Sequence, residues 1–252
     1  MIIHTHRIAL GIEYDGSAYH GWQIQPTQNT VEGQINRALT QIANTPIKVT
    51  CAGRTDVGVH AKGQVAHFDT HAERPLDAWV RGVNSLLPPD IAIQWARIVP
   101  DTFHARFSAK SRSYRYVIYN MPTRSALYAR QMTWYRHPLN HVLMNEAAQY
   151  FIGTHDFSAL RDADCQAKTP IRTISKIDIS RADEFITVHI TANAFLHHMV
   201  RNLMGVLLPI GSGLQPPRWA DEVLKGKDRK QAGITAPSQG LTLMAVEYDG
   251  LI

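Results

Sequence analysis

Apolar residues recur with two distinct spacings through the first hundred residues, one typical of strands and one typical of helices. A period of two predicts strands at residues 8–14, 47–51, 64–69 and 91–95. Helical spacing predicts one helix from Val31 to Ile42, with Thr30 as its N-cap, and another from Pro75 to Leu87. The resulting order is β-α-β-β-α-β, which is the ferredoxin-like arrangement.

The second half of the chain has the same order of elements without any repeat of sequence. Its predicted strands cover residues 112–120, 172–180, 184–192 and 241–248. Its predicted helices cover residues 139–152, 196–208 and 217–224. We therefore expect an α+β protein with domains at 1–105 and 106–252. Two ferredoxin-like halves could place their antiparallel sheets side by side and leave an active-site cleft between them.

The positive charge of the chain and its distribution suggest a candidate partner. The net charge is +5 and the isoelectric point about 9.3, which suits a nucleic acid but is weak evidence alone. Residues 102–145 contain no acidic residue, and aromatic rings are interleaved with basic side chains. The basic side chains are Arg106, Lys110, Arg112, Arg115, Arg124, Arg130 and Arg136. RNA contact and a solvated basic strand with an aromatic core face explain this stretch equally well.

Several classes of protein are disfavoured by composition. With 44% apolar and 19% charged residues the chain can bury a core. The longest apolar run, near residues 203–210, is too short to span a bilayer, and Met1–Arg7 lack the apolar region of a secretory signal. Cys51 and Cys165 form no CxxC pair, which predicts buried free thiols in a reducing cytoplasm.

Candidate catalytic residues lie in the loop after the second predicted strand. The sequence of this loop is Cys51-Ala-Gly-Arg-Thr-Asp-Val-Gly-Val-His60. Gly53 and Gly58 would allow sharp turns on either side of Asp56. With Arg54 nearby, the Asp56 carboxylate could act as a nucleophile or a general base. A turn aspartate bonded to its own backbone is the ordinary alternative, and the loop alone favours that alternative.

The wider sequence changes this balance, because the loop resembles the catalytic motif of the tRNA pseudouridine synthase A family. Val57 departs from the alanine that many members carry, which is a small apolar change. Further segments in the same order also resemble that family. The matching segments are residues 14–23, 53–61, 63–68, 114–120, 153–158, 195–205 and 236–241.

The resemblance implies a role for each of five residues. Asp56 corresponds to the catalytic nucleophile, and Arg201 to a basic residue that pairs with it. Tyr114 corresponds to the aromatic side chain that lies against the target uracil. Arg54 is a candidate for contact with the RNA backbone or for helping to expel the base, and Leu241 for the apolar wall of the pocket.

The resemblance also implies the reaction and the partners. Members convert uridine to pseudouridine at positions 38, 39 and 40 of the tRNA anticodon stem-loop, and they work as homodimers. The product is an isomer of the substrate, so neither a cofactor nor a metal is expected. The 13 histidines form no H-E-x-x-H motif. His197 and His198 are adjacent on a predicted helix, so we expect their rings to point about 100° apart.

Two other functions compete with this interpretation. Two ferredoxin-like sheets with aromatic residues could form an RNA-binding module without chemistry, but the RNP1-like aromatic signature of such modules is missing. A hydrolase with His60 or His67 as base would need a nucleophile or a metal site, and neither has recognisable spacing. Among pseudouridine synthases, the motif around Asp56 favours the A family.

Overall fold

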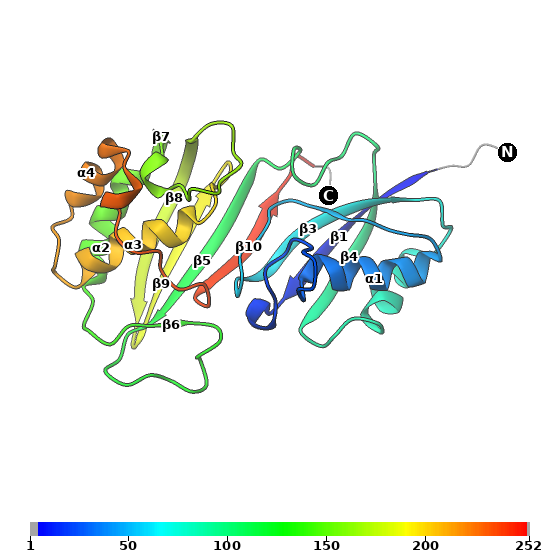
Figure 1. Cartoon of the computed structure of the whole chain (residues 1–252), viewed down its shortest axis with the longest axis horizontal. Coiled ribbons are helices and arrows are strands. Elements are labelled where there is room, and N and C mark those ends of the chain that lie inside the picture. The colour runs from blue at the N-terminus through cyan, green and yellow to red at the C-terminus, as the bar shows by residue number, and fades with distance from the viewer. Residues whose placement is uncertain (1–4, 251–252) are drawn as a thin grey trace. The chain divides into compact units, whose positions relative to one another are not determined.

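Two units make up the chain in the computed structural model, which describes residues 5–250 (Figure 1). The first comprises Met1–Lys110 and Thr242–Ile252, and the second comprises Ser111–Leu241. The first four residues, which entered the expectation about a secretory signal, lie outside the described part. The division differs from the predicted boundary at 105/106 because the last strand pairs within the first unit. Periodicity predicts a strand but does not identify its partner.

The sheet of the first unit is built around β1 (His6–Tyr14). β3 (His60–Thr70) and β4 (Ile91–Val99) flank β1, and both pairings are antiparallel. The short β2 (Thr50–Cys51) is antiparallel to β3, whereas β10 (Leu241–Glu247) joins β3 in parallel through Thr242 and Leu243. The sheet is therefore mixed rather than purely antiparallel.

Both helices predicted for the first unit are present. α1 (Val31–Ala43) begins after Thr30, whose hydroxyl accepts a hydrogen bond from the Gly33 amide, as the sequence predicts. The segment after Pro75 is helical and contains a π-helical turn, Ala78–Gly82, with the Trp79 side chain fully buried. α1 lies over one face of this unit's sheet (Figure 1).

The sheet of the second unit has the order β5-β9-β8-β7, with antiparallel neighbours throughout. These strands are β5 (Ser111–Tyr119), β9 (Phe185–Ala192), β8 (Ile171–Ala182) and β7 (Gly153–Asp156). β6 (Thr133–Trp134) pairs in parallel with β5. The sequence prediction missed β6 and β7 because such short strands have too little periodicity to detect.

Three α-helices belong to the second unit: α2 (His141–Ala148), α3 (Met199–Gly211) and α4 (Trp219–Gly226). Asn140 caps α2 by accepting hydrogen bonds from the amides of Val142 and Leu143. The 3₁₀ turns of the chain cover Gly16–Ala18, Gln149–Phe151, Ser158–Leu160 and Arg229–Gln231. Among residues 5–250, every helix is too short or too polar to cross a membrane.

The start of α3 corrects one prediction. The periodicity places it at Leu196, but the helix begins at Met199 because His198 has a left-handed backbone with φ of 60°. His197 and His198 therefore precede the helix. Their rings stack with centroids 4.0 Å apart, so the expected divergence of about 100° is wrong. The mixed α+β class is confirmed.

Candidate active site

The loop that carries Asp56 is held by the segment that follows β1. The Thr55 hydroxyl lies 2.8 Å from the Tyr14 hydroxyl, and the Thr55 carbonyl accepts a hydrogen bond from the Trp22 amide at 3.0 Å. On the other side, the Gln64 side-chain amide donates to the Gly53 carbonyl at 2.6 Å. Tyr14, Trp22 and Thr55 are buried. The residue before Asp56 is thus fixed through both its side chain and its backbone.

Close backbone contacts explain why glycine occupies two positions of that bracing segment. At Gly21, which has φ of 80°, a Cβ atom would lie 2.8 Å from the Thr55 carbonyl oxygen. At Gly16 a Cβ atom would overlap the carbonyl oxygen of Val59. Within the loop itself, Gly58 has φ of 76°. The backbone also bends at Gly53, but without a positive φ, and a Cβ atom there would meet nothing within 4 Å.

His60 and His67, the two candidate bases of a hydrolase, each accept a hydrogen bond from a backbone amide. The Nδ1 atom of His60 accepts from the Gly16 amide at 3.0 Å and lies 3.1 Å from Asp15 Oδ1. The Nδ1 atom of His67 accepts from the Ala105 amide at 3.2 Å. Burial, with the nearby Arg7 cation, lowers the pKa of His67 to about 4. Both rings are almost fully buried, which disfavours the hydrolase interpretation.

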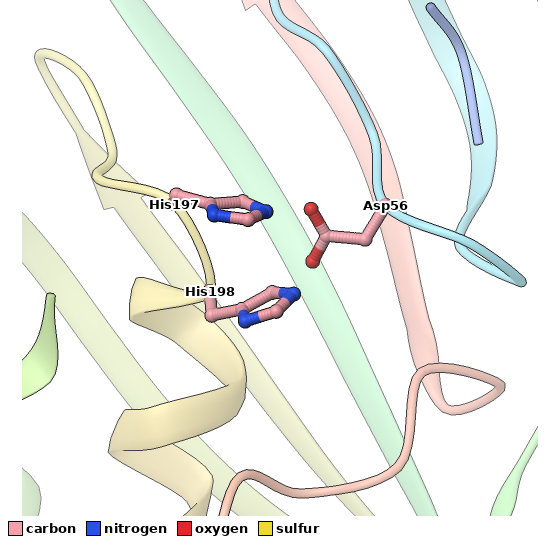
Figure 2. A group of neighbouring side chains, drawn as sticks. All are labelled: Asp56, His197 and His198. Atoms are coloured by element: carbon pink, nitrogen blue, oxygen red, sulfur yellow. The ribbon is translucent and has the colours of Figure 1, made fainter. Parts of the chain in front are cut away.

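Asp56 itself is more accessible than the residues that brace it. Its side chain projects from the loop that joins β2 to β3 and is only partly buried (Figure 2). Arg54 is exposed, and the Val57 side chain is 56% exposed. A rigid loop with an accessible carboxylate and an accessible guanidinium suits attack on a bound substrate.

The other candidate residues, Tyr114, Arg201 and Leu241, belong to the second unit. Tyr114, on β5, is 8% exposed and contacts Phe195 edge to face, with ring centroids 5.0 Å apart. Arg201, on α3, is partly buried, and its Nε donates to the Ala236 carbonyl at 2.8 Å. Leu241 is 4% exposed.

One buried tyrosine joins these elements within the second unit. The Tyr116 hydroxyl lies 2.6 Å from the Thr133 hydroxyl and donates to the Pro237 carbonyl at 2.9 Å. Burial raises the pKa of Tyr116, so its hydroxyl keeps its proton. The segment 236–241 is consequently tied to β5 by Tyr116 and to α3 by Arg201. The Tyr116 side chain is fully buried.

The two cysteines have different environments. Cys51 is buried, and burial raises the pKa of its thiol to about 12. Cys165 is only partly buried, so the expectation of two buried thiols is wrong for this residue. Its sulfur accepts a hydrogen bond from the His197 amide at 3.4 Å. That amide precedes the ring that stacks on His198 at the entry to α3 (Figure 2).

Comparison with known proteins decides the family. A family model described as tRNA pseudouridine synthase matches residues 11–108 and 147–249. The chain belongs to the tRNA pseudouridine synthase family. A relative from Coxiella burnetii named tRNA pseudouridine synthase A is 54% identical over 242 residues, which are 96% of this chain and 93% of that protein. One of the same name from Pseudomonas aeruginosa is 53% identical over 97% of this chain and 86% of its own length.

The match to the synthase family covers most of the candidate residues. Arg54 and Asp56 fall in its first segment, and Arg201 and Leu241 fall in its second, whereas Tyr114 lies between them. Among solved structures, an archaeal box H/ACA sRNP Nop10-Cbf5 complex aligns with 80% of this chain and 44% of that chain. The TM-score is 0.35 and the identity 11%, a similarity too low to support an argument.

Proposed function

We propose that this synthase isomerises uridine to pseudouridine in tRNA, at positions 38, 39 and 40 of the anticodon stem-loop, with Asp56 as the nucleophile. Membership of the tRNA pseudouridine synthase family carries the proposal. Relatives at more than half identity, over nearly the whole chain, bear the name tRNA pseudouridine synthase A. The braced, accessible carboxylate of Asp56 supports its assignment within that reaction.

The chemistry needs no oxidant, reductant or resident metal. The bond between uracil N1 and ribose C1′ breaks, the base rotates, and C5 of uracil bonds to C1′. The hydrogen at C5 leaves as a proton, and N1 gains one, so the product is an isomer. Attack of Asp56 on the ribose carbon, abstraction of a proton by it, and its addition to the uracil ring all require an ionised carboxylate beside the base.

The remaining candidates have supporting roles. We assign Arg201 to stabilising the carboxylate of Asp56, which a guanidinium does well through charge-assisted hydrogen bonds. Tyr114 is assigned to the face of the target uracil, and Leu241 to the apolar wall beside it. Arg54, which is exposed, is assigned to the RNA backbone. A stacked uridine must be extruded at a cost of a few kcal/mol, which phosphate contacts from basic side chains would offset.

We also propose a fold for each unit and an oligomeric state for the enzyme. Each unit is a variant of the ferredoxin-like arrangement, which the antiparallel neighbours β4, β1, β3 and β2 support in the first unit. In the second unit, α2 lies between β5 and β8 in the chain, and α3 follows β9. By resemblance to the family, the enzyme acts in the cytoplasm as a homodimer.

Mapping of the modified positions tests the site choice. A tRNA transcript with uridine at 38, 39 and 40 is incubated with the enzyme, treated with a carbodiimide that blocks pseudouridine, and analysed by primer extension. We expect stops that match these three positions. Matched transcripts with cytidine at one position at a time should lose only the corresponding stop. Stops elsewhere, with none in the anticodon stem-loop, would contradict the proposed site while leaving the reaction intact.

A further inference from the structure

A turn in the second unit contacts the entry to α3 at several points, and the roles assigned so far do not use it. The turn comprises Asp162–Cys165. The Nδ1 atom of His198 lies 2.7 Å from Asp162 Oδ2, and the Asp162 amide donates to the His197 carbonyl at 3.2 Å. The His197 amide donates in return to the sulfur of Cys165. The turn therefore clamps two consecutive residues immediately before the helix.

The contact between Asp162 and His198 determines which ring nitrogen of His198 carries a proton. An ionised carboxylate only accepts hydrogen bonds, so Nδ1 of His198 must carry the proton. Burial raises the pKa of Asp162, but the hydrogen bonds from the Asp164 amide and His198 outweigh this, so the net shift is downward. The carboxylate is thus ionised at neutral pH. A carboxylate that orients an imidazole in this way is a recurrent means of fixing its tautomer and rotamer.

The backbone at the same place adds a second constraint. His198 has φ of 60°, a backbone conformation that residues other than glycine adopt at a cost of about 1–2 kcal/mol. Its carbonyl accepts the first helical hydrogen bond, from the Asn202 amide at 2.8 Å. Arg201 lies directly before Asn202, and its Nε is bonded to the Ala236 carbonyl. The backbone of His198 therefore fixes the first turn of α3, from which the Arg201 side chain projects.

We propose that Asp162 is a positioning residue for the isomerisation, because it fixes the His198 ring and the first turn of the helix that carries Arg201. This inference rests on the proposed function of Arg201. Asp162 does not need to touch the substrate for this role. Its carboxylate acts mainly through the His198 ring, 2.7 Å from one oxygen, while the His197 ring lies 3.6 Å from the other.

Steady-state kinetics with a tritium-labelled tRNA distinguish positioning from simple stabilisation. Asp162→Ala should lower kcat by about tenfold, because small displacements of reacting groups are costly, while KM changes by less than about threefold. Asp162→Asn keeps an oxygen that accepts from Nδ1 and should restore kcat to within about threefold of the wild type. Asp164→Ala is the matched control, since Asp164 is an exposed aspartate of the same turn.

A double-mutant cycle and a spectroscopic signature complete the test. His198→Ala should lose as much kcat as Asp162→Ala, and the double variant should lose no more than either. Nitrogen-15 spectra should report the Nδ1–H tautomer of His198 in the wild type and in Asp162→Asn, but not in Asp162→Ala. If Asp162→Ala does not fold, the remaining variants still test the inference. Asp162→Asn should keep kcat within about threefold of the wild type, whereas His198→Ala should lower it by about tenfold.

Three outcomes would overturn the inference. The first is an Asp162→Ala variant with wild-type kcat, even if its melting temperature falls. The second is an effect of Asp162→Ala that adds in full to that of His198→Ala. The third is a wild-type enzyme that releases no tritium from any tRNA, which would overturn the proposed function as well. An active wild type with normal Asp162→Ala kinetics overturns only the inference.

Discussion

The hydroxyl groups of Tyr14 and Thr55 lie 2.8 Å apart in the interior of the first unit. This contact joins the end of β1 to the residue directly before Asp56. Because Tyr14 and Thr55 are both buried, neither hydroxyl can exchange its partner for bulk water. The opening strand of the chain is consequently part of the support of the proposed nucleophile.

Removal of the Tyr14 hydroxyl should affect both stability and turnover. Tyr14→Phe leaves the Thr55 hydroxyl without this partner, and we expect a loss of about 1–2 kcal/mol in the free energy of unfolding. Turnover should fall several-fold with little change in KM, because the loop carrying Asp56 loses one anchor. Urea unfolding and tritium release measure the two effects. Tyr150→Phe, at a half-exposed tyrosine of the second unit, should change neither.

A methyl group at Gly21 should disturb the same loop from the other side. Gly21→Ala combines a positive φ with a contact of 2.8 Å to the Thr55 carbonyl oxygen. We expect a loss of about 2–3 kcal/mol in the free energy of unfolding. Gly53→Ala is the matched substitution within the loop, where a Cβ meets nothing within 4 Å, and should cost less than about 0.5 kcal/mol. Equal losses in the two variants would argue against the bracing role of Gly21.

The sequence predicts the larger elements well and the local geometry less well. α1 and its cap at Thr30 are confirmed because the apolar spacing and the capping side chain agree. The predicted start of α3 is wrong because the apolar pattern runs through His198, which has a left-handed backbone and contacts Asp162 through its ring. A tertiary contact of this kind, 36 residues away in the chain, leaves no periodic signal.

The candidate residues illustrate the same limit. Asp56 is found through its resemblance to a family motif, because composition and spacing alone favour an ordinary turn aspartate. The support of its loop by Tyr14 and Thr55 could not be predicted, since a strand pattern does not tell which hydroxyl groups meet. The burial of Tyr116 follows from its alternation on β5, but its bond to the Pro237 carbonyl does not.

Acid should destabilise the fold through His67. Its pKa is lowered to about 4 by burial, by Arg7 and by His104, against a usual value of 6.5. Between these values the unfolded chain binds a proton that the folded chain does not, so stability is complete above pH 6.5 and falls as the pH drops toward 4. The loss should reach about 2–3 kcal/mol.

A histidine variant separates this effect from general acid unfolding. His67→Asn keeps an acceptor for the Ala105 amide but does not titrate, so its free energy of unfolding should vary less between pH 6.5 and 4. Urea unfolding across this range measures the slope for both proteins. An unchanged slope in His67→Asn would show that His67 is not the group responsible.

The two thiols should differ in reactivity at neutral pH. Burial raises the pKa of Cys165, but the hydrogen bonds from the His197 and Ala167 amides and the Arg161 side chain outweigh it and lower the value overall. Cys51 is buried with a raised pKa. We expect a disulfide reagent to modify one thiol rapidly in the native enzyme and both after unfolding. Cys165→Ser should abolish the rapid phase, whereas its retention would contradict the assignment.

The role of Asp56 is tested most directly by the release of tritium from tRNA labelled at C5 of uridine. Isomerisation must replace that hydrogen, so the assay needs no assumption about the route. The wild type should release tritium, whereas Asp56→Ala and Asp56→Asn should release none above the enzyme-free background while binding tRNA with similar affinity. Release by Asp56→Ala at a rate near that of the wild type would contradict Asp56 as the nucleophile.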